Sequence, residues 1–140
     1  MSKDDRIVNE LRRFPPLSGE DEYQLRRIAG HVTERRTQEG EVLLVEGEPA
    51  RTVHLLIEGR AAVTIKGAPI AQVGAGSILG EMGMLDHTAS VATVTVTEPG
   101  LVLTVDWQGF ESLLDSAAVS RSISATLAQR VRTLESQQDA

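Results

Sequence analysis

The sequence has no cysteine and very few aromatic residues, with one tryptophan, one tyrosine and two phenylalanines among 140 residues. The absence of thiols excludes zinc–thiolate sites, iron–sulfur clusters, thiol nucleophiles and thioredoxin-like redox chemistry. The scarcity of aromatic rings argues against base-stacking platforms. Basic side chains number 14 against 20 acidic ones, for a net charge of −6. Since nucleic-acid binding needs clustered cations, we expect no nucleic-acid partner.

Long apolar runs are also absent. No segment approaches the ~20 apolar residues that span a bilayer, and the start of the chain lacks the apolar core of a signal peptide. We therefore expect a soluble, cytoplasmic protein with no membrane partner. A chain of 140 residues corresponds to one domain, 1–140, which needs neither disulfides nor a structural metal to stay folded.

Residues 1–31 have helical spacing. Ile7, Leu11 and Phe14 fall on one face of a short helix, which Pro15 and Pro16 then end. A second helix follows. Its start resembles a capping box formed by Ser18 and Asp21, and Gly30 is a suitable end.

Residues 32–105 consist of short apolar runs broken by glycines. These are Gly40, Gly47, Gly59, Gly67, Gly74, Gly76 and Gly80. Regular breaks predict tight turns between many short strands. A short hairpin is expected at Lys66-Gly67-Ala68-Pro69, and a final pair of strands, 89–97 and 101–105, joined by Glu98-Pro99-Gly100. The fold class is therefore mainly β with flanking helices, an antiparallel β-roll or jelly-roll barrel.

Residues 106–140 return to helical spacing and end in a narrow apolar stripe. Its members are Val119, Ile123, Leu127, Val131 and Leu134. Such a stripe is buried either on the barrel or against a second copy of the same helix. We expect a homodimer through this C-terminal helix, with packing on the chain's own barrel as the alternative.

Several of these segments together resemble the cyclic nucleotide-binding domain family, of the catabolite-activator and protein kinase A regulatory-subunit type. The resemblance rests on Gly40-Glu41-Val42-Leu43, on Glu46-Gly47-Glu48-Pro49-Ala50 and on a cassette over residues 78–94 that opens Ile78-Leu79-Gly80-Glu81 and ends Ala92-Thr93-Val94. It implies a β-roll flanked by helices, with cAMP or cGMP held in the cassette. It also implies a C-terminal helix that moves when ligand binds.

The candidate ligand-binding residues all lie in this cassette: Gly80, Glu81, Met82, Gly83, Ser90, Val91, Ala92 and Thr93. Gly80 allows close approach of the backbone, and the first N–H groups after it could face a phosphate. The resemblance implies that Glu81 accepts a hydrogen bond from the ribose hydroxyl. The alternative is that Glu81 is an ordinary first-turn glutamate that stabilises a helix start.

One departure from the family pattern concerns the phosphate. The family's Pro-Arg pair falls on Ala89 and Ser90, so the arginine that would pair with the phosphate is absent. Arginine makes bidentate, charge-assisted contacts to an anion, whereas serine offers one neutral hydroxyl. Replacement by Arg60 is disfavoured because its strand position should point outward, and Arg51, in a loop, is the other candidate.

Catalytic and metal-binding patterns are not apparent. His31, His54 and His87 lack the spacing of a metal centre, and no Ser-His-Asp arrangement suggests itself, so we expect no enzyme, no metal and no cofactor. His87, in the cassette, is either a source of positive charge or an exposed loop residue.

The sequence predicts a regulatory or sensor domain that binds cAMP, cGMP or another small anion weakly, and that acts on an effector protein or domain. The alternative is a degenerate domain that has lost its ligand and serves for dimerisation or docking.

Overall fold

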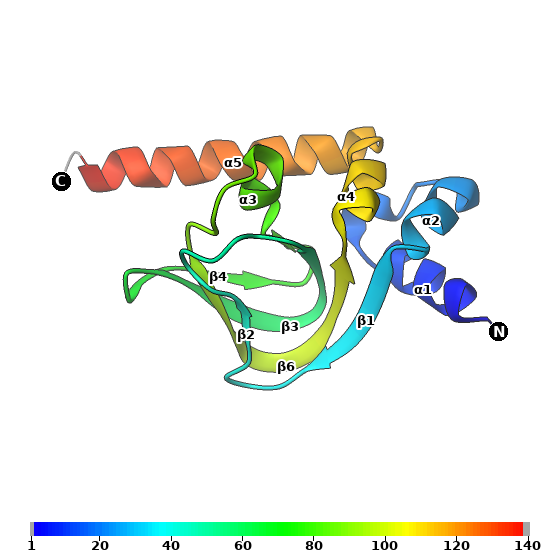
Figure 1. Cartoon of the computed structure of the whole chain (residues 1–140), viewed down its shortest axis with the longest axis horizontal. Helices are drawn as coiled ribbons and strands as arrows, with labels where there is room; N and C mark the ends of the chain where they lie inside the picture. The colour runs from blue at the N-terminus through cyan, green and yellow to red at the C-terminus, as the bar shows by residue number, and fades with distance from the viewer. Residues whose placement is uncertain (1, 139–140) are drawn as a thin grey trace.

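A computed structural model describes residues 2–138, apart from the side chains of residues 82, 86, 130–131 and 133–138. A six-stranded antiparallel sheet curls into an open roll, short helices gather at one end of it, and one long helix runs along its open side (Figure 1). The sheet does not close into a barrel. The expected fold class, a mainly β roll with flanking helices, is confirmed.

Two N-terminal helices and a 3-10 turn precede the sheet: α1 (Lys3–Arg12), η1 (Pro15–Leu17) and α2 (Glu22–Ala29). The expected start of α2 at Ser18 is wrong. The Asp21 carboxylate caps α2 by accepting a hydrogen bond from the Gln24 N–H at 2.8 Å, whereas Ser18 ends η1 and donates to the Pro15 carbonyl. Gly30 ends α2 as expected.

The six strands are β1 (Val32–Thr37), β2 (Val42–Leu44), β3 (Val53–Ile65), β4 (Ala68–Gly74), β5 (Ile78–Leu79) and β6 (Thr93–Val105). Their order is β1-β6-β3-β4, with β2 paired to β6 and β5 paired to β3. The hairpin between β3 and β4 is confirmed, since Lys66 and Gly67 both have positive φ, as a two-residue turn requires.

The expected strand breaks at Gly59 and at Glu98-Pro99-Gly100 are wrong, because β3 and β6 each continue for 13 residues. Their pairing shifts register between Glu58 and Ala61, which marks bulges there. A Cβ on Gly100 would lie 1.9 Å from the Glu58 carbonyl oxygen. The two glycines therefore let the backbones of two bent strands approach, rather than ending either strand.

The C-terminal helices are α4 (Trp107–Leu114) and α5 (Ala117–Gln138). Val119 and Ile123 are buried in the main core with α1, α2 and α4, and Leu127 packs against that core. The first part of the apolar stripe is thus covered by the chain itself. The side chains of Val131 and Leu134 lie outside the described residues. Within residues 2–138, no helix is both long and apolar enough to cross a bilayer.

Candidate ligand-binding site

The cassette backbone turns sharply at Gly80, which has φ 93° and caps the short helix α3 (Glu81–Asp86). A Cβ at Gly80 would lie 3.0 Å from the Thr52 carbonyl oxygen, and an L side chain is strained at this φ. Glycine is therefore required both by the turn and by the close approach of the Thr52 backbone, just before β3.

The loop 45–52 is fastened to the cassette by backbone hydrogen bonds. The Gly47 N–H donates to the Ser90 carbonyl at 2.9 Å, and the Ser90 N–H donates to the Glu48 carbonyl at 2.8 Å. Ala50 packs so closely on α3 that a Cβ added to Gly83 would meet the Ala50 Cβ at 2.6 Å. The residue pattern does not predict this contact, because Ala50 and Gly83 are 33 positions apart along the chain.

An inner cavity of about 440 Å³ lies between the roll, the cassette and α5. Of the eight residues predicted to bind ligand, five line this cavity: Gly80, Gly83, Ser90, Val91 and Ala92. Thr93 does not line it, and the side chain of Met82 is outside the described residues. Glu81 is fully buried and is not part of the lining.

The walls of the inner cavity are mostly aliphatic side chains of β3, β4 and β6, together with Leu44 and Leu79. Ala125, Thr126 and Gln129 of α5 complete the lining on the open side of the roll. The sequence did not predict these α5 residues, because their role depends on where the helix packs. None of the described lining residues carries a charge.

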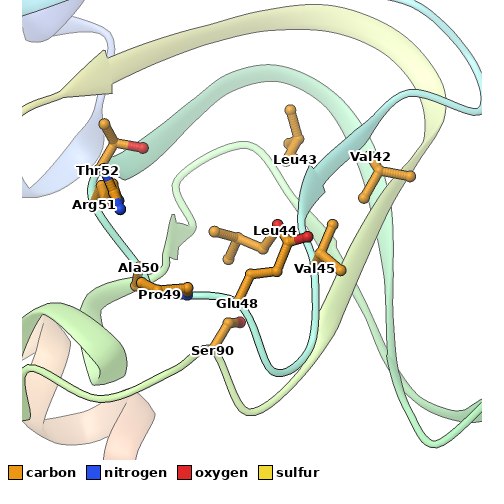
Figure 2. A pocket seen from close by; sticks show the side chains of 10 residues that line it. All are labelled: Val42, Leu43, Leu44, Val45, Glu48, Pro49, Ala50, Arg51, Thr52 and Ser90. Atoms are coloured by element: carbon orange, nitrogen blue, oxygen red, sulfur yellow. The ribbon is translucent and has the colours of Figure 1, made fainter.

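A second, outer cavity of about 460 Å³ is bordered by β2 and the loop 45–52. Figure 2 shows the Glu48 side chain running from this loop towards Leu44 and Val45, and Arg51 farther along the loop beside Thr52. Leu44 and Ser90 line both cavities. They therefore form part of the wall between the two.

Two hydroxyls of the cassette are used within the protein. Ser90 Oγ donates to the Ala92 carbonyl at 2.7 Å, and Thr93 Oγ1 accepts from the Glu46 N–H at 3.0 Å. The Ser90 proton therefore points to backbone instead of to a ligand in this conformation. The lone pairs of Ser90 Oγ can accept hydrogen bonds, but they cannot bind an anion.

The two arginines considered as replacements lie outside the inner cavity. Arg60 is exposed and approaches the Glu98 carboxylate at 4.0 Å, in agreement with the expected outward direction. Arg51 is exposed and lines the outer cavity. The inner cavity consequently contains neither guanidinium.

The three histidines lie in separate places. His31 Nδ1 is 3.3 Å from the Asp106 carboxylate, and His54 Nδ1 is 3.0 Å from Thr104 Oγ1. His87 ends α3 with its ring 5.0 Å from the Trp107 ring, which links the cassette to α4. His87 is exposed and is not among the residues that line the inner cavity.

A family model for the cyclic nucleotide-binding domain matches residues 34–117, which include the roll from within β1 onward, the cassette and α4. This chain belongs to the cyclic nucleotide-binding domain family. It is 31% identical over 106 residues to a cAMP-dependent protein kinase regulatory subunit of Yarrowia lipolytica, covering 74% of this chain and 28% of that protein. It is 29% identical over 113 residues to an uncharacterized NTE family protein of Mycobacterium tuberculosis, covering 80% of this chain and 19% of that protein.

Solved structures share the fold at low sequence identity. The structure of cAMP-bound PfPKA-R has a TM-score of 0.84 at 21% identity, covering 97% of this chain and 48% of that one. The regulatory subunit of a cAMP-independent protein kinase A from Trypanosoma brucei, as a cAMP-bound triple mutant, has a TM-score of 0.79 at 21% identity. The match covers 98% of this chain and 51% of that one. The chain thus spans less than a third of the curated relatives described here and about half of these solved chains.

Proposed function

We propose that this domain binds cAMP or cGMP weakly and uses the binding to regulate an effector protein or domain. The observation that carries the proposal is the inner cavity, which the cassette residues still line although no described lining residue is cationic. A domain that served only for docking would have no use for such a cavity beside its core. Ligand binding with a weakened phosphate site accounts for both features.

We predict that wild-type protein binds cAMP with a dissociation constant in the micromolar range or weaker, and that Ser90→Arg raises the affinity at least tenfold. Leaving a buried anion without its cationic partner costs ~2–5 kcal/mol, which corresponds to a factor of about 30 to several thousand. Isothermal titration calorimetry with cAMP and with cGMP measures the dissociation constants of the wild-type protein and of Ser90→Arg. Ala75→Arg, on an exposed turn outside both cavities, controls for the added charge.

Nanomolar binding by the wild-type protein would contradict this proposal, because it would require a cation inside the site. Undetectable binding by both the wild-type protein and Ser90→Arg would also contradict it. The second result would leave the docking alternative as the better account.

The output of the domain is part of the same proposal. The matched region covers 19% of the Mycobacterium tuberculosis protein and 28% of the Yarrowia lipolytica subunit, so in those proteins it accompanies a longer chain. We expect the present domain to act on such a partner, within the same chain or on another one, and to have no catalytic residues of its own.

Self-association through α5 is proposed only for the end of the stripe, because Ile123 and Leu127 already pack on the chain's own core. We predict that the double variant Val131→Asp, Leu134→Asp shifts the sedimentation mass from dimer to monomer and leaves the thermal midpoint nearly independent of concentration. Leu127→Asp is the matched comparison, and it should lower stability because it places a charge against the core. A wild-type protein that sediments as a monomer would refute the dimer.

A further inference from the structure

The inner cavity is suited to an uncharged ligand. Its described lining consists of aliphatic side chains, two glycines and three neutral polar residues, Ser90, Thr126 and Gln129. Apolar walls favour a flat base, and neutral polar side chains can pair with the edges of a base or with sugar hydroxyls. A phosphate has different needs, because an anion removed from water requires a cation or several aligned donors.

Three donors in or beside the cavity lining are already engaged by the protein. The Ser90 N–H and the Ser90 hydroxyl both donate to backbone carbonyls, of Glu48 and Ala92 respectively. Thr126 Oγ1 donates to the Ser122 carbonyl at 3.0 Å. A phosphate entering this part of the cavity would displace such bonds without receiving a charge in return.

Neither Arg51 nor Arg60 lines the inner cavity. Arg51 lies in the loop that borders the outer cavity, and Leu44 and Ser90 form part of the wall between the two cavities (Figure 2). Arg60 lies on the exposed side of β3 beside Glu98. The chain as a whole carries a net charge of −6, which adds a further general penalty for an anionic ligand.

We propose that the preferred occupant of the inner cavity is a nucleoside without phosphate, and that it binds this domain more tightly than the corresponding cyclic nucleotide. This inference rests on the proposed function, since it takes the cavity as the ligand site, but it differs in the ligand's charge. The base packs between the strands and α5, the ribose hydroxyls meet neutral groups, and the missing phosphate removes the one part for which the described lining supplies no cation.

The test is calorimetry on the whole chain with four probes: adenosine, guanosine, cAMP and cGMP. For wild-type protein, at least one nucleoside should bind ten or more times more tightly than its own 3′,5′-cyclic phosphate. Ser90→Arg should reverse that order, because the new guanidinium benefits only the phosphate. Raising the salt concentration should leave nucleoside binding nearly unchanged.

Two variants on α5 locate the ligand. Ala125→Trp should abolish nucleoside binding, because Ala125 lines the cavity and a large ring would fill it, while its exposed position should leave folding intact. Ser124→Trp is the matched control, since Ser124 is the exposed neighbour and lines neither cavity. Its binding should match that of the wild-type protein.

Cyclic nucleotides binding as tightly as the nucleosides, or more tightly, in the wild-type protein would overturn this inference and leave the proposed function standing. Loss of cyclic nucleotide binding in Arg51→Ala would also overturn it, because the phosphate would then reach the outer cavity. Failure of all four probes to bind either the wild-type protein or Ser90→Arg would overturn both proposals together.

Discussion

Replacing Gly100 with alanine is expected to lower the free energy of unfolding by about 3 kcal/mol or more. The added Cβ would lie 1.9 Å from the carbonyl oxygen of Glu58, 2.3 Å from its carbonyl carbon and 2.7 Å from the Gly59 nitrogen. All three atoms are backbone, so no side-chain rotation relieves the overlap. The two long strands β3 and β6 would have to separate at their shared bend, where they hold the roll together.

The measurement is urea unfolding at neutral pH, with Gly74→Ala as the matched control. Gly74 ends β4 in the same sheet, its φ is not positive, and a Cβ there would meet nothing within 4 Å. Its replacement should change the unfolding free energy by no more than about 0.5 kcal/mol. Equal stability of the two variants would show that the strands at Gly100 yield without cost.

The same bend shows what the sequence could not predict. Pro99 and Gly100 are punctuation residues locally, and a turn was expected there. The strand instead continues because Gly59, 41 positions earlier, removes a second Cβ from the same crossing. Whether a glycine ends a strand or allows a close crossing depends on what lies opposite, and sequence spacing alone does not contain that information.

The local features were predicted well where the physical cause was local. Lys66-Gly67 forms the expected hairpin, in which both turn residues have positive φ and Gly67 adopts it without strain. Gly80 occupies a left-handed position at the start of the cassette for the same reason. The apolar stripe of α5 was also visible, but periodicity shows only which face is apolar and does not say what covers it.

In the candidate site, too, the features with a local cause could be predicted and those that depend on tertiary packing could not. The cassette segment that the family resemblance indicates lies at the inner cavity, and the neutral character of Ser90 follows from its identity. The wall supplied by Ala125, Thr126 and Gln129 was missed, because it depends on α5 crossing the open side of the roll (Figure 1). The contact between Ala50 and Gly83 was missed because it too is a tertiary approach.

Stability is expected to fall as the pH is lowered from 7 to 5, through a single buried histidine. Burial, together with the positive charge of Arg35, lowers the pKa of His54 from 6.5 to about 4, against smaller opposing effects of the Leu43 backbone and Glu41. In the unfolded chain the imidazole takes up a proton as the pH falls through about 6.5, while the folded protein keeps it neutral until about pH 4. The unfolded state therefore gains protons first, and the folded state loses stability over this window.

The expected loss is about 2 kcal/mol between pH 7 and pH 5, approaching about 3 kcal/mol at pH 4, and none arises from this residue above pH 7. Urea unfolding at pH 7, 6 and 5 measures it in the wild-type protein and in His54→Gln. Glutamine does not titrate and can keep a hydrogen bond to Thr104, which is 3.0 Å from His54 Nδ1. The measured pH range lies above the range in which Asp5 and Glu58 take up protons, because their arginine partners hold the pKa of each carboxyl below its ordinary value. If His54→Gln loses as much stability between pH 7 and pH 5 as the wild-type protein, the buried imidazole is not the cause, because the variant has no proton to bind at that position.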